Sequence, residues 1–100
     1  MSLQVELQYF NVCPDSGELL KRVRSAVEAV RFPVEFLETL VETPEAAINT
    51  RFRGSPTLLI NGEDYTGLPE PKNAYLACRI YEDGIPSTAQ IISRLQEHRP

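Results

Sequence analysis

The sequence predicts a single α/β domain, residues 1–100, in which helices flank a central four-stranded mixed β-sheet. Two observations predict this class. Apolar and polar residues alternate with a period of two in several short segments, and between these segments apolar residues recur at helical spacing. The segments follow one another in the order β-α-β-α-β-β-α. A chain of 100 residues is long enough for one domain with a modest core, but not for two.

The first half of the chain predicts a β-α-β unit. Residues 3–10 alternate between the two faces of a strand. From Glu18 onward the apolar residues form one helical stripe, and Pro33 ends this helix. Residues 34–41 are rich in β-branched and aromatic side chains, which favour a second strand. A right-handed helical crossover between the two strands would make them parallel.

Two further helices are predicted from their start signals. Thr43 is a good N-cap, Pro44 suits the first helical position, and Glu45 places an acidic group in the first turn. Ser87 is the predicted N-cap of the last helix, which carries its apolar residues at helical spacing.

The remaining strands are predicted on either side of a loop. Residues 57–60 form the third strand, and the Asn61-Gly62 pair after it signals a reversal of the chain. Residues 63–74 contain prolines and glycines and are predicted to be a loop. Apolar residues alternate again in residues 75–81, which are therefore predicted to be the fourth strand.

Composition and charge narrow the classes of function. A formal net charge of -4 argues against binding to nucleic-acid phosphates. No apolar run approaches the roughly 20 residues of a membrane span. Two cysteines are too few for a disulfide scaffold, and a single histidine, His98, without a cysteine cluster predicts no metal site. The chain is therefore expected to be cytoplasmic and to bind neither nucleic acid nor membranes.

Cys13 lies between the first strand and the first helix, where sites form in open α/β sheets. A thiol at a helix N-terminus meets the positive end of the helix dipole, which favours the thiolate, although the adjacent Asp15 opposes it. Pro14 suits the first helical turn. In a competing geometry, Asp15 and Glu18 form a capping pair and Cys13 lies two residues outside the helix. In either geometry, Cys13 is a reactive or ligating thiol, or it is only a small apolar residue that fills the strand end.

These motifs resemble those of the thioredoxin-like proteins. Residues 9–16, an amphipathic helix and the later Gly54-Ser55-Pro56-Thr57 occur in the same order, and the likeness covers nearly the whole chain. Small stand-alone proteins of this kind, some related to alkylmercury lyases, begin with a Gly-Cys-Pro-Asn-Cys motif. They also carry a late Cys-Arg-x-Tyr, which is present here at residues 78–81. The resemblance implies that Pro56 is a cis-proline packed against an active-site Cys13.

Ser16 departs from the dithiol pattern, because it stands where a dithiol relative has its second cysteine. The motif has the Cys-x-x-Ser form of monothiol glutaredoxins. A serine hydroxyl can hydrogen-bond a thiolate but cannot resolve a mixed disulfide, so the resolving thiol must come from glutathione, a partner or Cys78. Ser16 is alternatively no more than a helix-start residue.

Two interpretations of Cys78 follow from its alternating segment. It shares an apolar face with Leu76 and Ile80, which predicts a buried small hydrophobe. In the functional interpretation it is a resolving thiol or a soft-metal ligand. An intervening strand is expected to keep its Cα more than about 7 Å from that of Cys13, too far for a direct bond.

Candidate binding residues lie next to Pro56. Arg51 and Arg53 precede this residue, and their guanidinium groups together with the backbone edge at the proline are suited to an extended peptide or to the carboxylates of glutathione. Alternatively, the two arginines only end a helix in solvent. Arg79 is expected to stack on a tyrosine at the surface. The candidate catalytic residues are Cys13, Ser16 and Pro56, and the candidate substrate-binding residues are Pro14, Arg51, Arg53, Ser55 and Thr57.

Two functions of different classes fit these residues. One is a thiol-disulfide oxidoreductase or thiol transferase in which Cys13 is a monothiol nucleophile, acting on protein or small-molecule thiols with glutathione as a co-substrate. The other is a non-catalytic thioredoxin-like module that binds a partner protein or a soft metal ion through Cys13. Organomercurial cleavage would follow from the resemblance alone and would need a carboxylate beside two thiolates.

Overall fold

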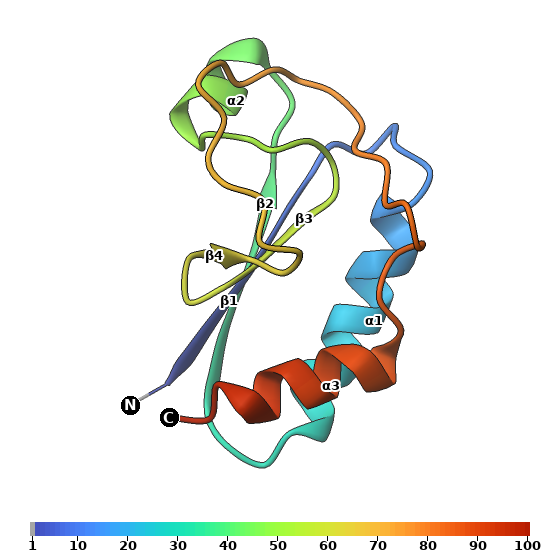
Figure 1. Cartoon of the computed structure of the whole chain (residues 1–100), viewed down its shortest axis with the longest axis vertical. Helices are drawn as coiled ribbons and strands as arrows, with labels where there is room; N and C mark the ends of the chain where they lie inside the picture. The colour runs from blue at the N-terminus through green and yellow to red at the C-terminus, as the bar shows by residue number, and fades with distance from the viewer. Residues whose placement is uncertain (1) are drawn as a thin grey trace.

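The computed structural model describes residues 2–100, which form a mixed α/β fold with four strands and three helices (Figure 1). The elements are β1 (Leu3–Tyr9), α1 (Ser16–Ala29), β2 (Val34–Leu40), α2 (Pro44–Asn49), β3 (Thr57–Ile60), β4 (Glu63–Asp64) and α3 (Thr88–Glu97).

The four strands form one mixed sheet in the order β2-β1-β3-β4. β1 pairs in parallel with β2, with Leu3 opposite Val34, and pairs antiparallel with β3, with Leu7 opposite Leu58. The parallel pairing confirms the predicted β-α-β unit. Because side chains alternate along each strand, Val5 and Leu7 of β1 share one face with Leu58 and Ile60 of β3.

The position of the fourth strand was predicted wrongly. β4 follows β3 after the two-residue turn Asn61-Gly62, and both turn residues have positive φ, as tight hairpin turns require. The turn brings the next residues into register at once, so that the strand lies inside the segment predicted to be a loop. Residues 75–81 form no strand, and one isolated bridge joins Cys78 to Ser55. Ile80 is 87% exposed, so the alternation there marks no buried face.

The main core lies between one face of the sheet and two helices. α1 and α3 contact each other and lie on the same side of the sheet (Figure 1). Leu19 and Val23 of α1, together with Ile91 and Leu95 of α3, are fully buried against β1 and β3. Burying side chains of this size stabilises a fold by roughly 1.5–3 kcal/mol each, so this layer holds the domain together.

The opposite face of the sheet is only partly covered, although helices were expected on both faces. α2 forms a second, small cluster with Val41, Ala47 and Phe52 near the end of β2. Leu37 in the middle of β2 remains 57% exposed. Among the described residues, no helix combines the length and the apolar character needed to cross a membrane.

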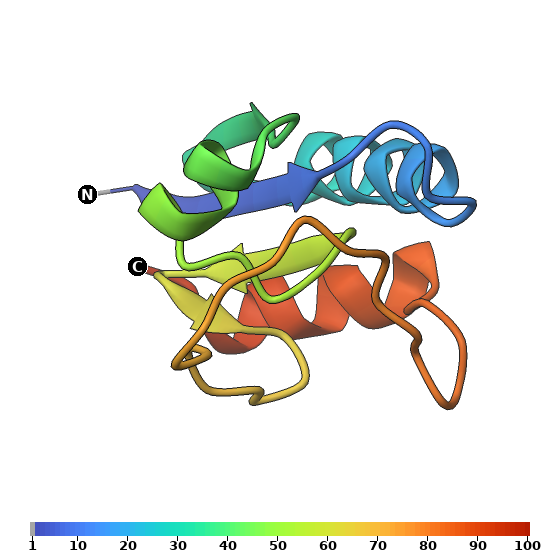
Figure 2. The ribbon, with the colours of Figure 1, turned by 90° about the horizontal axis from the view of Figure 1, so that it is seen from above.

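The connection between β4 and α3 runs past the ends of β1 and α1. It contains neither helix nor strand, and it passes α2 before it reaches the start of α3 (Figure 2). Arg79 and Tyr81 anchor it. The Arg79 guanidinium pairs with Asp64, and the Tyr81 hydroxyl donates to the Pro56 carbonyl at 2.7 Å. This route carries Cys78 to the start of α1.

Candidate functional site

Cys13 lies in two consecutive turns between β1 and α1. Its N–H donates to the Phe10 carbonyl at 3.1 Å, and its own carbonyl accepts from the Ser16 N–H at 3.2 Å. The N-cap of α1 is Asp15, whose side chain makes no capping hydrogen bond. Cys13 is therefore two residues outside the helix, as in the competing geometry, but without the capping pair that was expected there. Pro14 precedes the N-cap and is exposed, so its predicted place in the first helical turn was wrong.

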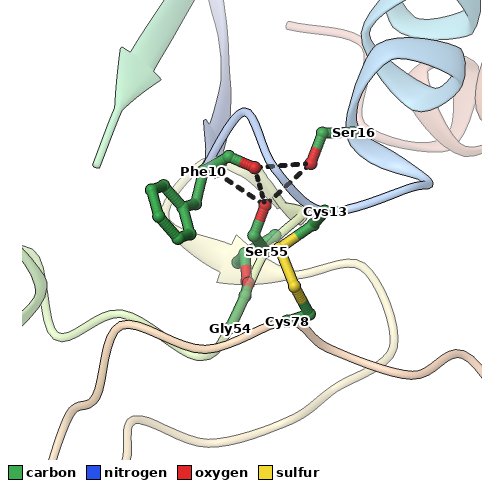
Figure 3. Close-up of a disulfide and its surroundings, with 7 residues drawn as sticks. Phe10, Cys13, Ser16, Gly54, Ser55 and Cys78 are labelled. Carbon is green, nitrogen blue, oxygen red and sulfur yellow. Dashed lines mark hydrogen bonds between the residues drawn. A yellow bond between two sulfur atoms is a disulfide. The ribbon is translucent and has the colours of Figure 1, made fainter. Parts of the chain in front are cut away.

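Cys13 forms a disulfide with Cys78 (Figure 3). The S–S distance is 2.11 Å, the Cα–Cα distance is 5.6 Å, and the two residues are 65 positions apart. The expectation that a strand separates the two cysteines was wrong, because residues 75–81 run directly beside Ser55 instead of crossing a further strand. Cys13 is 4% exposed, whereas Cys78 is an exposed residue. The prediction that Cys78 is a buried small hydrophobe was therefore also wrong.

The backbone edge at Ser55 is occupied by the chain itself. The Ser55 N–H donates to the Ala77 carbonyl at 2.9 Å, and the Arg79 N–H donates to the Ser55 carbonyl at 2.8 Å. This edge was predicted to hold a substrate peptide, but the segment around Cys78 lies there. Gly54 permits the approach, since a Cβ at this position would lie 2.9 Å from the Arg79 Cβ. The Ser55–Pro56 peptide bond is cis, as the resemblance implied.

Ser16 belongs to a hydroxyl cluster and makes no hydrogen bond to a sulfur atom. Its Oγ lies 2.8 Å from the Ser55 Oγ and donates to the Phe10 carbonyl at 3.2 Å. The Ser55 Oγ also accepts from the Phe10 N–H at 2.7 Å. These bonds tie the end of β1, the start of α1 and the residue before Pro56 together (Figure 3). Sequence reasoning identified Ser16 and Ser55 but not their contact with each other.

A buried ion pair holds the segment that carries Cys78. Arg79 donates to the two carboxylate oxygens of Asp64 at 2.6 and 2.9 Å, and the two side chains are only 9% and 1% exposed. Burial by itself raises the pKa of Asp64, but hydrogen bonds from Arg79 and Thr66 outweigh burial and lower this pKa to about 2. Burial likewise lowers the pKa of Arg79, and the hydrogen bond to Asp64 overcompensates and raises it.

Arg79 also stacks on a tyrosine, as predicted, but its side chain is buried and not at the surface. Its guanidinium carbon lies 4.7 Å from the centre of the Tyr81 ring. Burial raises the pKa of Tyr81 to about 12, which keeps its hydroxyl protonated and able to donate to Pro56. Sequence reasoning missed Asp64, whose role depends on the register of the β3-β4 hairpin. Correct use of the Asn61-Gly62 turn signal would have placed Asp64 on the sheet edge.

The two candidate arginines do not form a common binding site. Arg51 is exposed and has a left-handed backbone with φ of 55°, whereas the Arg53 Nε donates to the Leu68 carbonyl at 2.9 Å. Thr57 is buried, and its hydroxyl donates to the Gly54 carbonyl. Of the predicted binding residues, two bond to the segment that carries Cys78: Ser55 does so through its backbone, and the Thr57 hydroxyl accepts from the Arg79 guanidinium at 3.3 Å.

Comparison with known proteins identifies no relative: no protein-family model matches the chain, and no curated protein matches it either. Within residues 2–100, no group of three or more histidine, cysteine or acidic residues is placed to hold a metal ion. The chemistry that the site offers is the exchange of the Cys13–Cys78 disulfide with external thiols.

Proposed function

We propose that this protein is a thioredoxin-like thiol-disulfide oxidoreductase whose redox pair is Cys13 and Cys78. The disulfide between these two residues carries the proposal. It supplies the second thiol that the Cys-x-x-Ser motif lacks, so Cys13 need not act as a monothiol. The sheet order β2-β1-β3-β4 and the position of Cys13 after β1 support the thioredoxin-like assignment, as does Pro56 next to the site.

The proposed reaction is a two-electron exchange. The oxidised protein accepts two electrons from two thiols, such as two molecules of glutathione. The Cys13–Cys78 bond breaks, a disulfide forms between the two donors, and the two cysteines end as thiols. The reduced protein passes the electrons to a protein or small-molecule disulfide by the reverse steps. No step needs a metal ion or another cofactor.

A structural role for the disulfide is the second candidate function. No helix or strand lies between Asp64 and Thr88, and a bond at Cys78 would hold this long connection in place. The two roles of the disulfide are typical of different cellular compartments. In the cytoplasm, where we place the protein, disulfides are usually transient and catalytic or redox-sensing, whereas permanent disulfides belong to oxidising compartments.

Two measurements test the proposed function. The first is the equilibrium of the Cys13–Cys78 pair in glutathione buffers, and the second is turnover of hydroxyethyl disulfide with glutathione as the electron donor. We expect a reduction potential above about -300 mV, since structural disulfides lie below this value. Cys13→Ser and Cys78→Ser should each remove the two-thiol equilibrium, and turnover that remains in either variant should depend on glutathione as the resolving thiol. Ser16→Ala is the matched control and should retain both the two-thiol equilibrium and turnover, because the Ser16 hydroxyl hydrogen-bonds to Phe10 and Ser55 and to neither sulfur. A potential below this limit together with absent turnover would identify a structural disulfide.

A further inference from the structure

The two cysteine residues of the disulfide differ in their exposure to solvent. Cys13 is 4% exposed and is enclosed by the turns after β1, whereas Cys78 lies in an exposed position on the connection between β4 and α3. Thiol-disulfide exchange requires the incoming sulfur to reach the sulfur that it attacks. The greater exposure of Cys78 therefore favours this residue as the one that exchanges with a substrate.

The backbone around Cys78 has one occupied edge and one open edge. Ser55 binds the Ala77 carbonyl and the Arg79 N–H, so the N–H and carbonyl of Cys78 itself face the other way. Neither of these two groups has a hydrogen-bond partner among residues 2–100. Unpaired N–H and carbonyl groups along an extended segment are the template on which a peptide strand adds to a protein.

A groove of about 340 Å³ adjoins the same segment. Ala77 and Cys78 line it on one side, and Leu68, Pro69 and Tyr75 are among its other lining residues. Leu68 is 43% and Tyr75 is 68% exposed. Two large exposed apolar side chains beside an open backbone edge and an exposed cysteine are typical of a surface that another chain covers.

We infer that Cys78 is the residue that exchanges with substrate, and that the groove beside it binds an extended peptide with apolar residues around the substrate's cysteine. This inference rests on the proposed function and assigns its substrate class. The peptide would pair with the open edge of Cys78 and place its apolar side chains on Leu68 and Tyr75. Cys13 is then the inner, resolving thiol, which reverses the order expected from the sequence.

The reaction proceeds in two steps from the reduced protein. The Cys78 thiolate attacks one sulfur of a substrate disulfide. A bond forms between Cys78 and that sulfur, the substrate S–S bond breaks, and the other substrate sulfur leaves as a thiolate and takes up a proton from water. The Cys13 thiolate then attacks the Cys78 sulfur, closes the Cys13–Cys78 disulfide and releases the second substrate thiolate. The protein loses two electrons and the substrate gains them.

The test uses a short synthetic peptide whose single central cysteine carries thionitrobenzoate as a mixed disulfide. One version has leucine and phenylalanine beside the cysteine, and the other has serine and glycine. In the Cys13→Ser protein, we expect Cys78 to release thionitrobenzoate about tenfold faster from the apolar peptide, because burial of one or two large apolar side chains accounts for a factor of this size. N-methylation of the peptide backbone beside the cysteine should remove the advantage.

Matched variants of the Cys13→Ser protein locate the effect. Tyr75→Ser should abolish the preference for the apolar peptide. Ile48→Ser should preserve it, because Ile48 is 61% exposed on α2 and does not line the groove. An unchanged preference in the Tyr75→Ser protein would overturn the assignment of the groove.

A second measurement does not depend on the folding of a variant. Reduced wild-type protein is labelled with less than one equivalent of the apolar peptide and quenched rapidly, and the first adduct is located by mass spectrometry. Most of the adduct should lie on Cys78, and a majority on Cys13 would overturn the inference. Absence of turnover with hydroxyethyl disulfide would instead defeat the proposed function, so the two failures are distinguishable.

Discussion

The ion pair between Arg79 and Asp64 is the most consequential contact at the scale of single residues. Both side chains are buried, and each leaves an unpaired charge when the other is removed. We expect Asp64→Asn to lower the free energy of unfolding by about 3 kcal/mol, measured by urea denaturation.

The matched control is the pair between Arg24 and Glu38, which has a similar short contact of 2.7 Å but an Arg24 side chain that is 55% exposed. Glu38→Gln should lower the free energy of unfolding by less than about 1 kcal/mol, because exposed ion pairs contribute little to stability. Equal losses for the two variants would show that burial of the Asp64 pair adds nothing.

The same carboxylate predicts a pH dependence. Its pKa is about 2 in the folded protein, below the ordinary value of 3.8. The unfolded chain therefore takes up a proton first, and stability is lost as the pH falls from about 4 to 2. The shift corresponds to about 2 kcal/mol. Between pH 4 and pH 2, the free energy of unfolding of the wild-type protein should fall by about 2 kcal/mol more than that of Asp64→Asn. Urea denaturation at each pH measures both values. Parallel curves for the two proteins would contradict the assignment.

The two cysteines differ in how far their roles could be predicted from the sequence. The position of Cys13 at the end of a strand was predictable, because the change from a period of two to helical spacing occurs next to it. Its partner was not predictable. Cys78 is 65 residues away, and its distance from Cys13 depends on the path of a connection without helices or strands. Local spacing carries no information about such a path.

At the scale of elements, two glycines predict opposite effects of the same substitution. Gly54 has φ of 105°, and a Cβ there would lie 2.9 Å from the Arg79 Cβ. Gly54→Ala should therefore lower the free energy of unfolding by about 1–3 kcal/mol, because it strains the backbone and displaces the segment around Cys78. Gly17 is in α1 with nothing within 4 Å of a new Cβ, so Gly17→Ala should gain about 0.5 kcal/mol. Urea denaturation of both variants tests this contrast, which a loss of stability in Gly17→Ala would refute.

The elements themselves were largely predictable from their start and stop signals. The Thr43 hydroxyl accepts from the Ala46 N–H, and Ser87 and Gln90 form a reciprocal capping box at the start of α3. The strand predicted at 75–81 is absent, because the alternation of Leu76, Cys78 and Ile80 does not correspond to a buried face. The irregular backbone there is fixed by Asp64 and Ser55, and both contacts come from other parts of the chain.

At the scale of the whole molecule, the disulfide joins two parts that are stabilised by different contacts. The core between the sheet, α1 and α3 takes its fully buried residues from those elements, and the connection between β4 and α3 adds only the partly buried Tyr65 and Ile85. The middle of this connection is held by the Arg79 ion pair, by the Tyr81 hydrogen bond and by Cys78. Its two ends accept hydrogen bonds from Arg22 of α1 and Arg94 of α3. Reduction should therefore loosen the connection and leave the core folded, which is what a repeated redox cycle requires.

The cost of reduction follows from the length of the loop that the disulfide closes. Because the cysteines are 65 positions apart, loop closure restricts the unfolded chain by an amount equivalent to about 4 kcal/mol, which is an upper value for the stabilisation. Urea denaturation with and without reductant should show a loss of about 2–4 kcal/mol, with an unchanged circular dichroism spectrum before the transition. The Cys13→Ser/Cys78→Ser protein should match the reduced wild type and respond to no reductant. Loss of the helical signal on reduction alone would mean that the core depends on the disulfide. The pair would then be structural, since a protein that unfolds in each cycle cannot act as a carrier of electrons.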